Sequence, residues 1–321
     1  MVTGAAGFLG SRIVHFAREA GWQVKAFDRV PLANADGVEA IVGDMGDAAV
    51  LRKACEGVSA VVHSAGLAHV FGPGAKDAAR FNEVNAAGTG KVVDAAVECG
   101  VAHIVAVSSV SVYGAGARDN CDETAPCKPQ GPYAMSKWLG ELKAIERMGN
   151  SSGSLTILRL ATLYGEGDRG NVARLIGLLD RGRFIWPGSG QNRKSLLYKD
   201  DAARACVAAL ERVSTGASTN IDAFNVSAEP AAMREIVTAI CVALGRPVPR
   251  LGIPSPLFKA GAALCRALGD PKQVSQQFEK FTRDDVYSAK KIEAALGFLP
   301  VVPLLEGMRR EVDFLRAGRS Q

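Results

Sequence analysis

The stretch MVTGAAGFLGSR, residues 1–12, decides the fold. Gly4, Gly7 and Gly10 recur at every third position between a short apolar strand and the start of a helix. In such a turn the first glycine permits a tight bend, the second lets the backbone approach a pyrophosphate, and the third allows close packing of helix on strand. The first amides of the helix then favour an anion through their unpaired N–H groups and the helix dipole. The spacing therefore predicts a dinucleotide-binding turn.

An acidic residue ends the second predicted strand. Asp28 lies 18 residues after Gly10 and closes the apolar run of residues 22–28. A carboxylate at this distance from a glycine turn takes the ribose hydroxyls of NAD. The neighbouring Arg29 can instead meet a 2′-phosphate, so NAD is favoured as the cofactor and NADP stays open.

The first half of the chain alternates short apolar runs with helical patterns, which is typical of strand-helix-strand units around a parallel sheet. Helices are predicted over residues 47–57 and 78–99. Buried strands are predicted over residues 22–28, 39–44, 60–65, 103–109 and 155–161. We therefore expect an α/β fold in which residues 1–165 form a Rossmann-type doubly wound parallel sheet that binds a dinucleotide.

Glycine and proline break this rhythm after about Gly165. We expect a smaller, mixed substrate-binding lobe from residues 166–198 and 227–321, with the chain returning to the first lobe at about residues 199–226. One departure concerns the first strand, because only three residues precede Gly4, whereas strands usually have about five or six residues. We expect either a shortened strand or a coding sequence that begins further upstream.

Composition favours a soluble enzyme of the cytoplasm. The 321 residues carry a net charge of +5 without a run of like charges, so we expect no nucleic-acid partner. Seven scattered cysteines argue against a disulfide framework. No leader precedes Gly4, and the apolar stretch of residues 253–269 contains two prolines and two basic residues, so we expect no membrane span. The histidines and cysteines show no metal-ligand spacing, so we expect no metal.

A tyrosine and a lysine supply the predicted chemistry. Tyr133 and Lys137 are four residues apart, which on a helix places both side chains on one face. A phenol with an ordinary pKa of about 10 is a poor base at neutral pH, but a nearby ammonium, together with the positively charged nicotinamide ring of NAD, lowers this pKa. Tyr133 can then exchange a proton with a substrate hydroxyl. Ser109, with Ser108 and Ser111 beside it, is the predicted hydroxyl donor at the carboxyl end of a strand.

The order of these motifs resembles the extended short-chain dehydrogenase/reductase family. The series comprises the glycine turn, the strand-end acid, GD at 43–44, HSAG at 63–66, NEVNAAGT at 82–89, SSVSVYG at 108–114 and YAMSK at 133–137. The resemblance continues through residues 158–165, 188–205 and 224–230. It implies an NAD-dependent enzyme, similar to nucleotide-sugar epimerases and dehydratases, with Ser109, Tyr133 and Lys137 as catalytic residues.

The predicted binding residues follow the same series. Arg193 is the candidate for the substrate diphosphate, because a guanidinium binds phosphate bidentately, and Ser109 and Ser111 complete the predicted substrate contacts. The predicted cofactor-binding residues are Gly4, Gly7, Phe8, Leu9, Gly10, Asp28, Arg29, Asp44, Met45, Ser64, Ala65, Gly66, Asn85, Ser108, Tyr133 and Lys137.

Related dehydratases and decarboxylases carry an extra acid just before the VYG segment, where this chain has Val110 and Ser111. Simple oxidation and reduction at a carbinol is therefore expected, as a 4-epimerase or a 4-ketoreductase of a nucleotide-activated sugar. Two other hypotheses stay open, a reductase of a steroid-like or phenolic ketone and a non-catalytic dinucleotide-binding redox sensor. The resemblance also implies a homodimer, which the apolar residues Ala87, Val92, Val93, Ala96, Trp138 and Leu142 permit unless they pack against the sheet.

Overall fold

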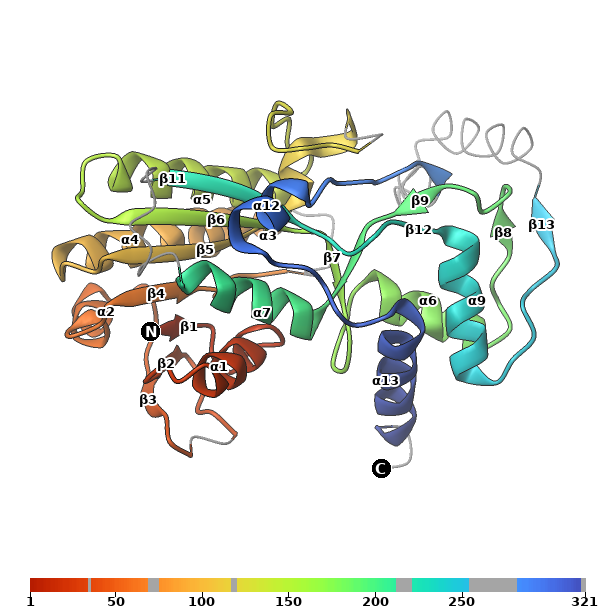
Figure 1. Cartoon of the computed structure of the whole chain (residues 1–321), viewed down its shortest axis with the longest axis horizontal. Helices are drawn as coiled ribbons and strands as arrows, with labels where there is room; N and C mark the ends of the chain where they lie inside the picture. Colours follow the sequence, from red (N-terminus) through yellow and green to blue (C-terminus); the bar gives the residue numbers. More distant parts are fainter. Residues whose placement is uncertain (34–35, 69–74, 117–119, 212–220, 254–281, 319–321) are drawn as a thin grey trace.

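Seven parallel strands form one sheet in the computed structural model, which describes residues 1–33, 36–68, 75–116, 120–211, 221–253 and 282–318 (Figure 1). Across the sheet the strands lie in the order β3 (Glu39–Val42), β2 (Lys25–Asp28), β1 (Val2–Thr3), β4 (Ala60–His63), β5 (His103–Ser109), β6 (Ser154–Leu160) and β11 (Ile221–Val226). The first six follow the Rossmann order, with the change of direction between β1 and β4. The predicted fold class is confirmed.

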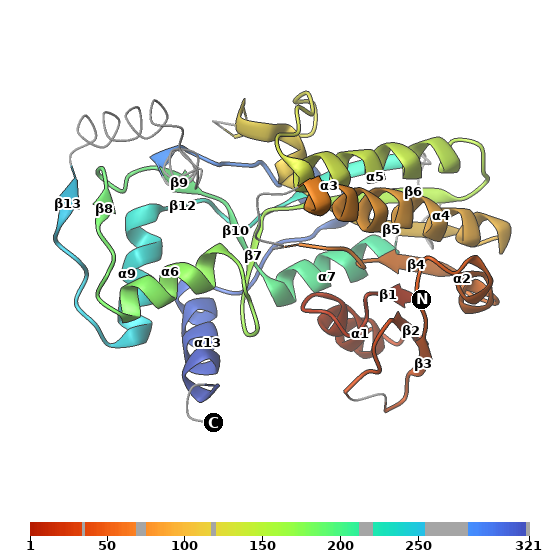
Figure 2. The ribbon, with the colours of Figure 1, turned by 180° about the vertical axis from the view of Figure 1, so that it is seen from behind.

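Helices cover both faces of this sheet. One face carries α1 (Gly10–Glu19) and α7 (Lys199–Leu210), and the other carries α2 (Ala48–Cys55), α4 (Gly88–Glu98) and α5 (Pro132–Met148). Figure 2 shows α4 and α5 side by side on the second face. The apolar side chains buried on the two faces together form the core of the large sheet. On the face of α1 and α7 they include Ile292 of α12 (Lys290–Leu296).

A second apolar core lies beyond the carboxyl ends of the strands (Figure 1). It joins α6 (Asn171–Asp180), α9 (Met233–Leu244) and α13 (Leu304–Ala317). Three two-stranded sheets accompany these helices, pairing β7 (Thr162–Tyr164) with β10 (Leu196–Tyr198), β9 (Arg193–Lys194) with β12 (Ala231–Ala232), and β8 (Trp186–Pro187) with β13 (Gly252–Ile253). The boundaries predicted for the two lobes stay predictions. Within the predicted smaller lobe, α12 packs on β11 of the large sheet.

The helix predicted over residues 78–99 is divided into three parts. These are α3 (Ala75–Phe81), a π-helical turn at Asn82–Ala87, and α4. The hydroxyl of Thr89 donates to the carbonyl of Asn85 at 2.6 Å, and thus satisfies a backbone acceptor in the π-helical turn. The spacing of apolar residues cannot reveal such a change of helix type, because buried side chains occur in all three parts.

The structure also bears on the other expectations. Six cysteines of the described residues are free thiols, and Cys265 lies outside the described residues, as does most of the apolar stretch at 253–269. In the described part of the chain, no helix has the length and apolarity that a membrane crossing needs, and no group of side chains suits a metal ion. Val92, Val93 and Ala96 are buried in the core of the chain itself, whereas Leu142 is exposed. The homodimer stays a prediction.

A buried carboxyl group joins α13 to the loop after β7. Glu311 is fully buried, and its Oε2 accepts a hydrogen bond from the Gly165 amide at 3.1 Å. Among the described residues its Oε1 has no hydrogen-bond partner. Burial, together with the negative charges of Asp168 and Glu166, raises the pKa of Glu311 to about 8. The carboxyl group is therefore protonated in the folded protein at neutral pH.

This raised pKa makes stability depend on pH. The folded protein binds a proton at Glu311 that the unfolded chain releases above a pKa of 4.5, so the free energy of unfolding falls as pH rises from about 4.5 to about 8. We expect Glu311→Gln to remove this loss and to be more stable than the wild type at pH 8.5, by on the order of 2 kcal/mol. Urea unfolding at pH 5, 7 and 8.5 measures the difference.

Glu306→Gln is the matched control, because Glu306 lies on the same helix but is exposed and pairs with Arg310 at 2.9 Å. Exposed pairs of this kind contribute little, so the control should keep the pH dependence of the wild type. Equal pH dependence in Glu311→Gln and the wild type would contradict the assignment.

Candidate active site

The glycine turn has the geometry that the sequence predicts. Gly4 has a φ of +69°, and the Gly7 amide donates to the Gly4 carbonyl at 2.9 Å. A Cβ on Gly10 would lie 1.9 Å from the same carbonyl oxygen, so only glycine lets α1 begin here. Phe8 is partly exposed beside the turn, whereas Leu9 is buried in the core. Because the Leu9 side chain is buried, Leu9 can contact a cofactor only through its backbone.

The predicted ribose-binding acid lies next to this turn. Asp28 ends β2, and its carboxylate accepts hydrogen bonds from the amides of Ala6 at 3.0 Å and Val30 at 3.2 Å. The carboxylate thereby helps to hold the turn in place. Arg29 is exposed and follows the strand directly. Both residues stay predicted cofactor contacts.

The loop after β4 borders the other side of the turn. A Cβ on Gly4 would lie 2.7 Å from the Cα of Ala65, which measures how closely the two backbones approach. The Ser64 hydroxyl donates to the Thr3 carbonyl at 2.8 Å. Gly66 continues the loop toward α5, since a Cβ there would lie 4.0 Å from Lys137 Nζ. The predicted residues 64–66 thus connect the glycine turn with the predicted catalytic helix.

Two further predicted contacts lie after β3. Asp44 is exposed, and its Oδ1 accepts from the Gly46 amide at 2.6 Å. Met45 reaches toward α4, where its Cε would lie 2.9 Å from a Cβ placed on Gly88. The carboxylate of Asp44 therefore closes a short turn at the edge where an adenine would be expected.

A chain of buried hydrogen bonds fixes this loop from below. The pKa of His63 is lowered by burial to about 3, so its ring is neutral. The Thr89 hydroxyl donates its one proton to the Asn85 carbonyl, so it accepts a hydrogen bond from His63 Nε2 at 3.0 Å. Because the neutral ring then carries its proton on Nε2, His63 Nδ1 accepts from the Thr3 hydroxyl at 2.8 Å. Thr3 in turn accepts from the Ala65 amide at 3.3 Å. This chain joins β1, β4 and α4.

Asn85 lies where this chain meets the loop. Its side chain accepts from the Leu67 amide at 2.7 Å and donates to the Leu67 carbonyl and to the Ser136 hydroxyl, each at 3.0 Å. With all of these bonds made, the buried amide positions the loop and α5. The sequence identified the residue, but not this supporting arrangement.

The three predicted catalytic residues lie together. Tyr133 and Lys137 come from the first turns of α5, and Ser109 ends β5. The Ser109 side chain lies close enough to the Tyr133 phenol to favour its ionised form, and its Oγ accepts from the Ser111 amide at 3.2 Å. Lys137 Nζ donates to the carbonyl of Val107 at 2.6 Å. The arrangement can bring the Tyr133 phenol and the Ser109 hydroxyl to one oxygen atom of a substrate, with the Lys137 ammonium nearby.

One electrostatic expectation is wrong for the protein by itself. The sequence predicts that Lys137 lowers the pKa of Tyr133, but burial raises this pKa, and the nearby Ser109 side chain opposes the rise. Burial lowers the pKa of Lys137 to about 8, against a raising influence of Glu141. Burial is therefore the largest influence on both groups, which sequence spacing cannot reveal.

Ser108 corrects a second expectation. Its hydroxyl is buried and donates to the carboxylate of Glu141 on α5, so the Ser108 side chain supports the helix rather than a cofactor. Glu141 in turn binds the guanidinium of Arg159 on β6. These two buried charges escaped the sequence reading, because nothing in their spacing of 18 residues indicates an ion pair. In contrast, the hydroxyl of Ser111 is buried and has no partner among the described residues.

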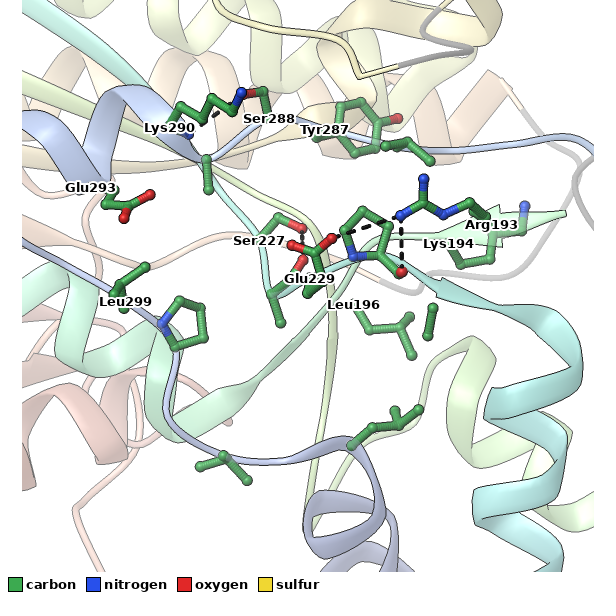
Figure 3. A pocket seen from close by; sticks show the side chains of 18 of the residues that line it. Arg193, Lys194, Leu196, Ser227, Glu229, Tyr287, Ser288, Lys290, Glu293 and Leu299 are labelled. Atoms are coloured by element: carbon green, nitrogen blue, oxygen red, sulfur yellow. Dashed lines mark hydrogen bonds and ion pairs between the residues drawn. The ribbon is translucent and has the colours of Figure 1, made fainter.

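Arg193 lies at a cavity of about 870 Å³ (Figure 3). Its half-exposed guanidinium lies 3.7 Å from a carboxylate oxygen of Glu229 and donates to the Pro230 carbonyl at 3.4 Å. Lys194 and Tyr287 also line the cavity, but Ser109, Tyr133 and Lys137 are not among the described residues that line it. The structure thus gathers the predicted catalytic group, and the diphosphate contact of Arg193 stays a prediction.

The turn fits a dinucleotide on its own geometry. The exposed Gly7 has no side chain to cover the backbone, and Gly10 allows the first amides of α1 to face the same space. The Asp28 carboxylate lies beside this space and can accept from ribose hydroxyls.

Curated proteins with related sequences are oxidoreductases and epimerases. The chain is 31% identical to the 2-alkyl-3-oxoalkanoate reductase of Stenotrophomonas maltophilia over 97% of both chains. It is 26% identical to the UDP-glucose 4-epimerase of Vibrio cholerae, over 99% of this chain and 96% of the epimerase.

Solved structures give the same picture. MoeE5 in complex with UDP-glucuronic acid and NAD superposes with a TM-score of 0.77 and 27% identity, over 99% of this chain and 98% of MoeE5. The sequence model of the NAD dependent epimerase/dehydratase family matches residues 1–227. The chain therefore belongs to the NAD dependent epimerase/dehydratase family, and NAD is the cofactor, as the glycine turn and Asp28 predict.

Proposed function

We propose that this protein is a 4-epimerase or 4-ketoreductase that acts on a carbinol of a nucleotide-activated sugar. The proximity of the Ser109 side chain to the Tyr133 phenol, with Lys137 one helical turn further along α5, carries the proposal. Both hydroxyls lie at the carboxyl end of a sheet strand, where open parallel sheets bind their ligands.

The three side chains have distinct parts in this chemistry. Tyr133 exchanges a proton with the substrate hydroxyl, while Ser109 donates a hydrogen bond to the same oxygen. The Lys137 ammonium favours the phenolate that this exchange requires. NAD, when bound, supplies hydride transfer, so the protein needs to hold the carbinol and move one proton.

The segment after β5 supports a reaction without dehydration. Val110 is buried and apolar, and Ser111 carries a hydroxyl, so neither residue can move a second proton as a carboxyl group would. The unpartnered hydroxyl of Ser111 suits a hydrogen bond to a sugar hydroxyl.

Arg193 supports a nucleotide-activated substrate. Its exposed contact with Glu229 is long, at 3.7 Å, and a diphosphate offers a guanidinium a better bidentate partner. MoeE5, which is 27% identical, is solved with UDP-glucuronic acid and with UDP-glucose, each together with NAD.

Reduction of a ketone without a nucleotide is the second candidate. The 31% identity to the Stenotrophomonas maltophilia reductase favours it. The same serine, tyrosine and lysine serve both reactions. The redox-sensor hypothesis is not retained, because the family consists of enzymes.

The tyrosine provides the first test. Tyr133→Phe should lower kcat/KM by about 10²-fold to 10⁴-fold, because proton transfer at the carbinol is lost, while NAD binding changes only a few-fold. Steady-state kinetics and NAD titration by protein fluorescence measure the two effects. Tyr198→Phe is the control, since its phenol hydrogen-bonds to Glu166 at 2.5 Å and is not among the described residues that line the cavity beside Arg193. A fully active Tyr133→Phe enzyme would refute the proposed chemistry.

The arginine distinguishes the two candidate functions. Arg193→Ala should raise KM for a nucleotide sugar by about 10-fold to 100-fold, the value of a lost charged hydrogen bond, and leave KM for an uncharged ketone unchanged. Arg246→Ala, which removes an exposed pair with Asp180, should affect neither substrate. An unchanged KM for the nucleotide sugar would remove Arg193 from the diphosphate site.

The fate of the cofactor separates epimerase from reductase. An epimerase returns the hydride to its substrate and retains NAD, whereas a reductase exchanges it at every turnover. The purified protein is therefore analysed by mass spectrometry for bound NAD and assayed with a panel of nucleotide sugars and of 3-oxoalkanoates. Epimerised sugar without net change in NADH identifies an epimerase, and stoichiometric oxidation of NADH identifies a reductase.

A further inference from the structure

A buried ion pair lies directly beneath the predicted catalytic group. Glu141 of α5 is 3% exposed and Arg159 of β6 is 6% exposed. Arg159 Nη2 donates to Glu141 Oε2 at 2.8 Å, and its Nε lies 3.2 Å from both carboxylate oxygens. The two side chains are therefore matched as planar, bidentate groups.

Further buried hydrogen bonds fix both charges. The Ser108 hydroxyl donates to Glu141 Oε1, and Arg159 Nη1 donates to the Tyr113 hydroxyl at 2.9 Å. Tyr113 then donates to Asn225 Oδ1 on β11 at 2.7 Å. The network therefore joins α5 to β5, β6 and β11, and its geometry is determined by several elements at once.

The position of Glu141 connects this network with the active site. Glu141 lies one helical turn after Lys137 and two turns after Tyr133, on the same helix. Ser108, which it holds, directly precedes Ser109 at the end of β5. The carboxylate thus links the two elements that supply the catalytic side chains.

The charges around Lys137 indicate what the carboxylate does. On α5 its neighbours are the neutral phenol of Tyr133 and the Glu141 carboxylate; from β4 it faces His63, which is neutral. From β5 it meets the Val107 carbonyl. Arg159 on β6 is a further buried cation, and Glu141, which it binds, also acts on Lys137. Without the carboxylate two buried cations would repel each other.

We propose that Glu141, clamped by Arg159 and Ser108, is a positioning residue that keeps Lys137 an ammonium and holds it in register with Ser109. Burial disfavours the charged form of Lys137, and Glu141 counteracts this effect. Arg159 holds the carboxylate in its orientation through the bidentate pair. This role deepens the proposed function, on which its catalytic meaning rests, but it has a direct physical readout.

The titration of Lys137 provides that readout. The reactivity of each lysine toward trace acetic anhydride is measured from pH 6 to 10 and quantified by mass spectrometry of the peptide that contains Lys137. In Glu141→Gln we expect the labelling curve of Lys137 to move to lower pH by about one unit, so that labelling at pH 7 is up to about tenfold faster. An unchanged curve in folded protein would overturn the proposal.

A double variant separates the charge effect from loss of structure. Glu141→Gln with Arg159→Met removes both charges, and cores generally tolerate the loss of a complete ion pair better than the loss of one partner. Its Lys137 curve should lie between those of the wild type and of Glu141→Gln, because the repelling guanidinium is gone. If the single variant fails to fold, the double variant still has to label earlier than the wild type, and equal curves would overturn the proposal.

Glu146→Gln is the matched control, since Glu146 lies on the same helix with its side chain exposed. It removes the same charge from α5 and should leave the Lys137 curve unchanged; an equal shift in this variant would show a general effect of charge and overturn the proposal.

Kinetics connect the result with function. The alkaline limb of kcat/KM should move to lower pH in Glu141→Gln by the same interval as the labelling curve. Should no substrate be turned over by the wild type, the proposed function fails, while the labelling still decides the role of Glu141. A labelling shift without a kinetic shift would overturn the catalytic part of this inference.

Discussion

The carbonyl oxygen of Gly4 and the α-carbon of Gly10 leave no space for a side chain between them, since a Cβ on Gly10 would lie 1.9 Å from that oxygen. This contact lets α1 begin after the tight turn of residues 4–9 that follows the two-residue strand β1. Ala65, in the loop after β4, also approaches Gly4 closely. Backbone atoms thus meet where the strand order reverses between β1 and β4, and their close approach depends on the absence of Cβ atoms at Gly4 and Gly10.

Buried polar groups carry this geometry to the catalytic side chains. Neutral His63 connects the strand of the glycine turn with α4, and Asn85 continues from there to Leu67 and Ser136. Each donor in this chain has one acceptor available, so the direction of the bonds is determined. Such networks cost stability when one member is removed, because a buried partner is left unsatisfied. The loop and α5 are therefore held in one arrangement.

Local patterns were sufficient for the fold and for bringing Ser109, Tyr133 and Lys137 together, whereas the roles of these residues and the cofactor and substrate contacts stay predictions. The glycine spacing, the acid at Asp28 and the Tyr133–Lys137 interval depend on a few neighbouring residues, and all are present as predicted in position. Strand β5 agrees over its whole length. At β2 the predicted run began three residues before the residues that pair, and at β4 it extended two residues beyond them.

Long-range packing was beyond the reach of the sequence. The pairing of Glu141 with Arg159 needs α5 and β6 in contact, and it diverts Ser108 from the predicted cofactor role. The raised pKa of Tyr133 likewise results from burial, which a helical interval does not indicate. The expectation for Arg193 concerned a single residue, whereas the cavity beside it is shaped by segments as distant as residues 227–231 and 299–304.

The placement of α12 has a consequence for how the protein holds together. Helix α12 packs on β11 of the large sheet, although the segments before it in the chain already form most of the second core. After α12 the chain returns to that second core and forms α13 there. Neither the core of the large sheet nor the second core is built from one continuous piece of the chain. A proteolytic cut in a segment that connects the two cores would leave the fragments associated. Removal of the residues of either core would separate α12 or α13 from the side chains against which it packs. The two cores should accordingly melt as a single cooperative unit.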